Sequence, residues 1–151
     1  MKSLITILFA IASFHVAAQS VSANFDKALA QKLGADEYGM RSYVMGILKT
    51  GPTVIDDQEK MDDLFRGHMD NIQKMSAKGE LVVAGPFKSN DQNYRGMYIF
   101  NVKSREEAEM LLKNDPMIAA KVMVVELYDW YGSAALGEYI PVHNKIEQRK
   151  P

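Results

Sequence analysis

The sequence predicts a ferredoxin-like α+β fold, and three observations lead to this prediction. Four stretches rich in β-branched and aromatic residues alternate with two helical stretches in the order β-α-β-β-α-β. Glycine, proline or helix-capping residues stand at most of the boundaries between these stretches. No internal repeat or low-complexity segment interrupts the order. We therefore expect a four-stranded antiparallel sheet with two helices on one face.

The first half of the domain contains a strand, a long helix and a second strand. The first strand covers residues 41–49 and is closed by Gly51 and Pro52. The helix covers residues 58–78, and Gly79 is positioned to end it. Residues 81–84 form the second strand, which turns at Gly85 and Pro86.

The second half contains a strand, a helix, a further helical turn, a fourth strand and a C-terminal tail. Residues 95–102 form the third strand, and Ser104 caps a helix to about residue 113, with Glu107 completing a capping box. Asp115 and Pro116 open a further helical turn, because aspartate favours the N-cap and proline the first helical position. The fourth strand covers residues 122–128, and a tail covers residues 132–151.

The strands are apolar on both faces, which predicts a second covering layer. In the first strand Tyr43, Met45 and Ile47 lie on one face, while Val44 and Leu48 lie on the other. Two helices cover only one face of a sheet, so the other face needs a different partner. We expect a homodimer with its sheets packed face to face, a dimeric α+β barrel. The alternative is a monomer whose C-terminal tail covers the second face.

The N-terminus has the features of a cleavable signal peptide over residues 1–18. Lys2 precedes an apolar run, and Val16 and Ala18 are small residues at the positions that a signal peptidase reads. The run is too short to span a bilayer, although a permanent anchor is the alternative. We expect an exported protein, periplasmic or secreted, without stable membrane association after cleavage.

Three segments follow the signal peptide. Residues 19–39 form a lead-in that could be helical over residues 22–33, with Ser22 as N-cap and Gly34 as its end. Residues 40–131 form the α+β domain, and residues 132–151 form the C-terminal tail. Loss of the first 18 of 151 residues leaves 133, enough for one domain with its own core.

The composition excludes several classes of function. Because Lys2 leaves with the signal peptide, 17 basic residues face 19 acidic ones, a net charge of −2. This balance, without a basic stripe, argues against nucleic acid as a partner. The absence of cysteine excludes disulfides and thiol chemistry. Two histidines after the signal peptide, His68 and His143, do not make a metal-ligand cluster, so we expect no metal site.

His68 is the candidate for proton transfer. The long helix has one apolar stripe, and His68 falls near its middle, so its imidazole should face the sheet. The stripe consists of Met61, Leu64, Phe65, Met69, Ile72 and Met75. Two interpretations stay open: a core histidine bonded to a backbone carbonyl, or a catalytic group. Asp115 could cap its helix, orient His68, or do both, because a cap uses only one carboxylate oxygen.

The ordered motifs of the core resemble the YCII-related (YciI-like) family. The resemblance covers residues 41–130, and no single motif in it is specific, whereas the ordered set is. The residues that carry it are Tyr43, Val44, Arg66, Gly67, His68, Gly79, Gly85, Pro86, Arg95, Gly96, Glu106, Glu107, Ala108, Asp115 and Pro116.

This resemblance implies a dimeric α+β barrel with His68 and Asp115 as a catalytic pair in a pocket. It also implies elimination chemistry on small chlorinated aromatic rings, although the export signal sets this chain apart from many relatives. The first hypothesis is an enzyme that transfers protons on an unknown small molecule without a cofactor, by elimination, isomerisation or hydrolysis. Arg95 or Arg66 would hold an anionic group of the substrate. The second hypothesis is a non-catalytic homodimer that binds a small ligand or has a structural role.

Overall fold

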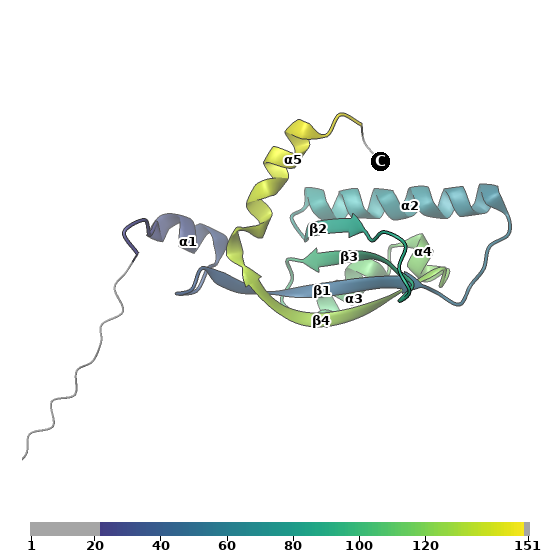
Figure 1. Ribbon diagram of the computed structural model, residues 1–151, viewed down its shortest axis with the longest axis horizontal. Coiled ribbons are helices and arrows are strands. Elements are labelled where there is room, and N and C mark those ends of the chain that lie inside the picture. Colours follow the sequence, from purple (N-terminus) through teal and green to yellow (C-terminus); the bar gives the residue numbers. More distant parts are fainter. Residues whose placement is uncertain (1–21, 150–151) are drawn as a thin grey trace, which may run out of the picture.

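A computed structural model describes residues 22–149, so the predicted signal peptide, residues 1–18, lies outside the described residues. Four antiparallel strands form one sheet in the order β2-β3-β1-β4 (Figure 1). The strands are β1 (Met40–Thr50), β2 (Leu81–Pro86), β3 (Tyr94–Phe100) and β4 (Met123–Ser133). The helices are α1 (Lys27–Leu33), α2 (Gln58–Ala77), α3 (Arg105–Leu112), α4 (Pro116–Ala119), the 3-10 helix η1 (Ala134–Tyr139) and α5 (Ile140–Ile146).

The predicted β-α-β-β-α-β order and the ferredoxin-like antiparallel sheet are confirmed. The boundaries follow the capping signals of the sequence. Asp57 caps α2 by accepting the N–H of Lys60, and Gly79 follows the helix with a φ of +71°, which glycine adopts without strain. Ser104 caps α3 by accepting the N–H of Glu107, whose carboxylate in turn accepts the N–H of Lys103.

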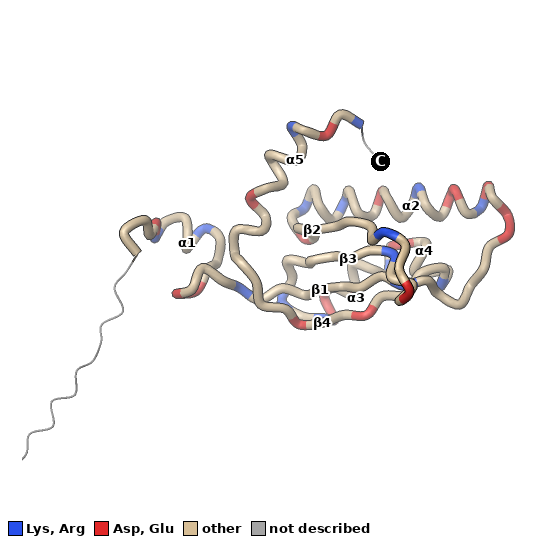
Figure 2. The backbone as a smooth tube through the Cα atoms, viewed as in Figure 1, with Lys and Arg blue, Asp and Glu red and all other residues tan. Residues whose placement is uncertain are grey.

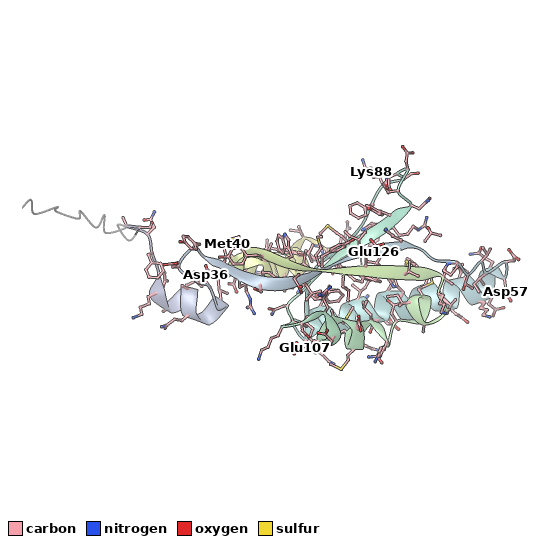
Figure 3. All side chains as sticks on the ribbon, turned by 90° about the horizontal axis from the view of Figure 1, so that it is seen from below. Asp36, Met40, Asp57, Lys88, Glu107 and Glu126 are labelled. Carbon is pink, nitrogen blue, oxygen red and sulfur yellow. The ribbon has the colours of Figure 1, made fainter. Side chains whose placement is uncertain are left out.

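The main core lies between the sheet and helices α2, α3 and α4, which cover one face as predicted. Figure 3 shows these helices on one side of the sheet and Lys88, in the loop after β2, on the other. The buried residues of this core alternate along the strands, because successive side chains point to opposite faces. They include Val44, Leu48, Leu81, Tyr98, Phe100, Met75, Ala108, Leu112 and Met117.

The C-terminal segment covers part of the second face of the sheet. Leu136 and Ile140 pack against a smaller core formed by Tyr43, Val82 and Ile99. The hydroxyl of Tyr139 donates to the carbonyl of Val82 at 2.5 Å, and Tyr43 donates to the carbonyl of Ser133 at 2.9 Å. The alternative of a tail on the second face is therefore partly realised.

The remaining part of the second face lies over the middle of β1, β3 and β4. Register places Met45 opposite Tyr128 and Ile99, and Ile47 opposite Glu126 and Met97. Tyr128 is 46% exposed, and Met45, Ile47 and Met97 are half-buried. This open part of the face is mainly apolar, with the ion pair of Lys49 and Glu126 at its margin.

Two predicted boundaries were wrong. The fourth strand continues beyond residue 128 to Ser133, because every residue of β1 from Met40 to Thr50 has a partner in β4. Helix α1 begins at Lys27 instead of near Ser22, because Asp26 is its N-cap and accepts the N–H of Leu29. Its end at Gly34, with a φ of +66°, is confirmed.

The helices outside the core are short, at seven residues for both α1 and α5. In the part of the chain from residue 22 to residue 149, no helix combines the length and the apolar character needed to cross a bilayer.

Candidate active site

His68 lies on the face of α2 that is turned toward the sheet, as its place in the apolar stripe predicted. The residue is only 7% exposed, and its Nδ1 lies 2.6 Å from Oδ2 of Asp115. The two side chains form a buried His/Asp pair across the interface between α2 and the N-terminus of α4. The structure therefore brings together the two residues for which the sequence suggested a pairing and the family resemblance implied one.

Asp115 is completely buried and uses its two oxygens for two different purposes. Oδ1 accepts the N–H of Met117 at 3.0 Å and that of Ile118 at 3.4 Å, which caps α4. Oδ2 faces the imidazole. A carboxylate oxygen that faces a ring nitrogen at 2.6 Å acts as the acceptor, so the nitrogen is the donor. We infer that Nδ1 of His68 carries a proton and donates it, which leaves the other ring nitrogen, Nε2, as an acceptor.

A close helix contact sets the distance between the two halves of the pair. Gly67, directly before His68, packs against the ring of Pro116, directly after Asp115. A Cβ atom at residue 67 would lie 2.6 Å from Cγ of Pro116, so only glycine lets α2 and α4 approach this closely. The contact therefore fixes the distance between the imidazole of His68 and the carboxylate of Asp115.

Tyr98 on β3 is the third polar side chain at the pair. Its hydroxyl lies 3.4 Å from Nε2 of His68, and the residue is 2% exposed. Burial raises the pKa of the phenol well above its ordinary range, and the negative charge of Asp115 adds to this effect. Tyr98 therefore stays protonated near neutral pH and presents an O–H to the acceptor nitrogen.

Sequence reasoning missed Tyr98, although one signal was present. Gly96, Tyr98 and Phe100 alternate along the third strand and share the face that packs against the helices. A tyrosine on the helix-facing side of a strand needs a hydrogen-bond partner when it is buried. His68 on the covering helix is that partner.

Phe65 differs from its predicted place in the buried stripe. Its ring centroid lies 6.1 Å from that of His68, but the residue is 53% exposed. The reason is that the buried residues of α2 are His68, Asn71 and Met75, so the buried side of the helix is turned away from Phe65. An exposed aromatic ring thus lies beside the imidazole.

The two arginines proposed for substrate binding do not lie at the pair. Arg66 points outward from α2 and forms an ion pair with Asp63. Arg95 is exposed on β3, and strand alternation places it on the face opposite to that of Tyr98. A role for either arginine in holding a substrate anion stays a prediction, and neither is among the polar contacts of His68.

The tail histidine is also remote from the pair. His143 lies on α5 and is exposed. Among residues 22–149, no three histidine, aspartate or glutamate side chains gather as they would around a metal ion. The polar side chains that meet at the pair are one imidazole, one carboxylate and one phenol.

Comparison with known proteins gives one family. The model of the YCII-related domain matches residues 42–131, which is more than half of the chain and includes His68, Tyr98 and Asp115. This chain belongs to the YCII-related family. The match ends at Tyr131, so the YCII-related domain excludes α1, η1 and α5.

Solved structures are also similar to this YCII-related chain, among them 5-chloro-2-hydroxyhydroquinone dehydrochlorinase from Burkholderia phenoliruptrix AC1100, in complex with 2,5-dihydroxybenzoquinone. The two chains share 18% identity over 58% of this chain and 92% of the other, with a TM-score of 0.41. No curated protein matches this chain.

Proposed function

We propose that this chain is a small-molecule enzyme in which His68 and Asp115 transfer a proton without a cofactor. One observation carries the proposal: Asp115 holds Nδ1 of a buried imidazole at 2.6 Å, which leaves Nε2 as the basic nitrogen. A general base needs a defined tautomer and a lone pair that can accept a proton. Asp115 defines the tautomer, and the lone pair of Nε2 faces only the long 3.4 Å contact from the Tyr98 hydroxyl.

The proposed reaction begins when Nε2 of His68 takes a proton from the substrate. The electrons of the broken bond stay on the substrate, where they expel a leaving group in an elimination or shift a double bond in an isomerisation. In a hydrolysis, Nε2 takes the proton from a water molecule instead, the water oxygen bonds to the substrate, and the bond to the leaving group breaks. The imidazolium then carries both protons, and the carboxylate of Asp115 stabilises its charge. Return of the proton from Nε2 to the leaving group or product restores the neutral ring, so no oxidant is needed.

Tyr98 and Phe65 have roles in this proposal. At 3.4 Å the contact between the Tyr98 hydroxyl and Nε2 is longer than a strong hydrogen bond, so the hydroxyl can turn toward a bound substrate. Because its pKa is raised, the phenol donates a hydrogen bond to negative charge that develops on the substrate. Movement of the exposed Phe65 ring would open the imidazole to a substrate.

A non-catalytic function is the second candidate, and the burial of the pair favours it. His68 is 7% exposed, and each of its ring nitrogens already faces a polar atom of the protein. A core histidine that satisfies Asp115 and Tyr98 would have the same geometry. In that case the domain would bind a small ligand elsewhere or serve as a structural homodimer.

A metabolite-library screen separates the two candidates. Thermal shifts and product formation are measured for the wild type, His68→Ala and the matched control His143→Ala, which removes an exposed histidine of the tail. The enzyme proposal expects a compound that is converted by the wild type and by His143→Ala, and that His68→Ala does not convert although it stays folded. Conversion that persists in folded His68→Ala would refute the role of the pair.

We also propose that two copies associate through the open part of the second face. Tyr128 is 46% exposed and Ile47 is half-buried, and neither belongs to the small core against which the C-terminal segment packs; Met45, also half-buried, lies between them and that core. Sedimentation of the wild type and of Ile47→Lys tests this proposal, with Val142→Lys on α5 as control. A dimer in the wild type and the control, and a monomer in Ile47→Lys, is expected. A monomeric wild type at micromolar concentration would overturn it.

We also propose that the protein is exported to the periplasm or the medium. Fractionation of cells tests this location.

A further inference from the structure

A separate polar pocket lies behind the His/Asp pair, between α2 and the end of α3. Its volume is about 260 Å³, below the range of pockets for drug-sized ligands and suited to a small metabolite. Neither His68 nor Asp115 lines it, although each has a direct neighbour in the chain that does. The lining residues are Gly67, Asn71, Lys74, Met75, Lys78, Glu80, Leu111 and Asn114.

Two polar side chains of this pocket, the buried Asn71 and the half-buried Glu80, have buried polar atoms without adequate partners. Asn71 is only 6% exposed, and the one side-chain hydrogen bond of its amide is a 3.8 Å contact from Nδ2 to the sulfur of Met75. Oε2 of Glu80 is buried and has no hydrogen-bond partner within residues 22–149. A buried polar group without a partner is costly, and a carboxylate oxygen costs more than a neutral one. The pocket therefore offers an acceptor with negative charge and an amide that can both donate and accept.

The rim of the pocket adds positive charge. Lys74 and Lys78 lie near the C-terminal end of α2, and Figure 2 shows basic residues toward this end of the helix and acidic residues toward its start. Neither lysine is within ion-pair distance of Glu80 in the described part of the chain. Favourable interaction with the helix dipole explains lysines at this end, but it does not explain a carboxylate buried beside them.

We propose that this pocket binds a small zwitterion with an ammonium and a carboxylate group, of the size of a simple α-amino acid. The ammonium would donate to the carboxylate of Glu80 at its accessible oxygen, and its positive charge would compensate for the burial of the second oxygen, Oε2. The ligand carboxylate would lie toward Lys74 and Lys78, with the amides of Asn71 and Asn114 as further donors. Two lysines and one glutamate give the lining a formal charge of +1, which disfavours a ligand that is only a cation.

Titration with defined probes tests the class of ligand. Glycine and alanine are compared with acetate, which lacks the ammonium, and with methylammonium, which lacks the carboxylate. Backbone amide NMR signals of residues that line the pocket report binding, and calorimetry gives the affinity. We expect saturable binding of at least one amino acid, and about tenfold weaker binding of each half-molecule, because each loses one charge-assisted interaction. The proposal is overturned if neither amino acid shows saturable binding at millimolar concentration. It is also contradicted if acetate binds as tightly as the amino acids, because the site would then be one for anions in general.

Substitutions identify the atoms that recognise the ligand. Glu80→Gln should weaken amino-acid binding about tenfold and leave acetate unaffected, whereas the matched control Glu109→Gln on α3 should change neither. Lys78→Gln should weaken the amino acid and acetate alike, with Lys113→Gln as its control. Lys78 is exposed, so its variant remains informative if Glu80→Gln does not fold. Unchanged amino-acid affinity in a folded Glu80→Gln or Lys78→Gln would refute the assignment.

Binding here is independent of the proposed catalysis. His68→Ala removes the proposed base but no residue of this pocket, so it should retain the affinity for the zwitterion. Failure of the enzyme proposal would therefore leave this inference standing, and failure of zwitterion binding would leave the His/Asp proposal untouched.

Discussion

Nδ1 of His68 lies 2.6 Å from Oδ2 of Asp115, and the second oxygen of the same carboxylate caps α4. One buried side chain thus defines the tautomer of the imidazole and the start of a helix. This dual use means that substitutions at Asp115 separate into those that keep the cap and those that lose it.

Asp115→Asn should reverse the tautomer of His68. The amide oxygen can still accept the N–H of Met117, because asparagine is a good N-cap. The amide nitrogen would then face Nδ1 as a donor, so the ring proton should move to Nε2. We expect a loss of about 1–3 kcal/mol in the free energy of unfolding, because an ionic hydrogen bond becomes a neutral one. Nitrogen-15 NMR of the ring reports the tautomer, and an unchanged Nδ1–H form would contradict the assignment. Asp115→Ala loses the cap as well and should cost about 3–5 kcal/mol.

Tyr98→Phe should leave the fold intact and change the surroundings of Nε2. The ring keeps its place against Phe100, whose centroid lies 5.4 Å away, and only the hydroxyl is lost. Urea unfolding should show a destabilisation of about 1 kcal/mol, because the lost bond at 3.4 Å is weak. If the proposed mechanism holds, turnover of any substrate found in the screen falls in this variant. Tyr94→Phe on the same strand is the control. A loss as large as that of Asp115→Ala would show that the phenol is mainly structural.

Gly67→Ala should destabilise the protein although alanine is the better helix former. The added Cβ would lie 2.6 Å from Cγ of Pro116, so α4 must move away from α2. We expect the overpacking to cost about 1–3 kcal/mol, which the gain of about 1 kcal/mol from helix propensity offsets only in part. Thermal unfolding measures the difference, and Gly85→Ala is the control, because no atom lies within 4 Å of its Cβ position. A stabilised Gly67→Ala would show that the contact between α2 and α4 is loose.

Tyr131→Phe should make the attachment of the lead-in less dependent on pH. The hydroxyl of Tyr131 donates to Asp36, which lowers the pKa of Asp36 and raises that of Tyr131 to about 12. Because the pKa of Asp36 is lowered, its stabilisation is present above the ordinary value of 3.8 and is lost as the pH falls through the folded value. Because the pKa of Tyr131 is raised, its part is present below 10 and is lost as the pH rises toward about 12.

Titration by NMR tests this link. In Tyr131→Phe the pKa of Asp36 should rise toward 3.8 without reaching it, because the N–H groups of Met40 and Tyr38 still donate at 2.9 Å. The difference in stability between the wild type and the variant should vanish in acid. An Asp36 pKa that is equal in both proteins would show that the hydrogen bond does not persist in solution.

Leu136→Ala should loosen the C-terminal segment. Leu136 packs against the small core of the second face, so its truncation should cost about 1–2 kcal/mol, less than a fully buried leucine. Hydrogen exchange of the amides in η1 and α5 should become faster, while that of α2 stays unchanged. Val142→Ala, at a residue that is 58% exposed, is the control and should have little effect. Equal effects of the two substitutions would contradict the packing role of Leu136.

Local signals in the sequence predicted most of the fold. The cap at Ser104, the glycine at residue 79 and the period of the long helix depend only on neighbours in the chain, so they could be predicted. The inward direction of His68 followed from the same period. The full length of β4 could not be predicted, because pairing with β1 extends the strand and strand pairing is a long-range property.

The candidate site was predicted in part. His68 and Asp115 were expected as a pair, chiefly through the family resemblance, and the capping role of Asp115 followed from the proline after it. Tyr98 was missed because its contact requires knowing which strand lies beneath α2. The exposure of Phe65 was missed because the helix period gives the centre of a buried stripe more reliably than its edge.

The distance along the chain between the two halves of the pair has a consequence for folding. His68 and Asp115 are 47 positions apart, and the segment between them contains β2, β3 and α3. Local helices and the hairpin can form early, whereas the pair closes only after this loop is complete. The NMR signals of the His68 ring therefore report the late, long-range step of folding directly. In a chain emerging from the ribosome, the contact between His68 and Asp115 cannot form until α4 has been synthesised.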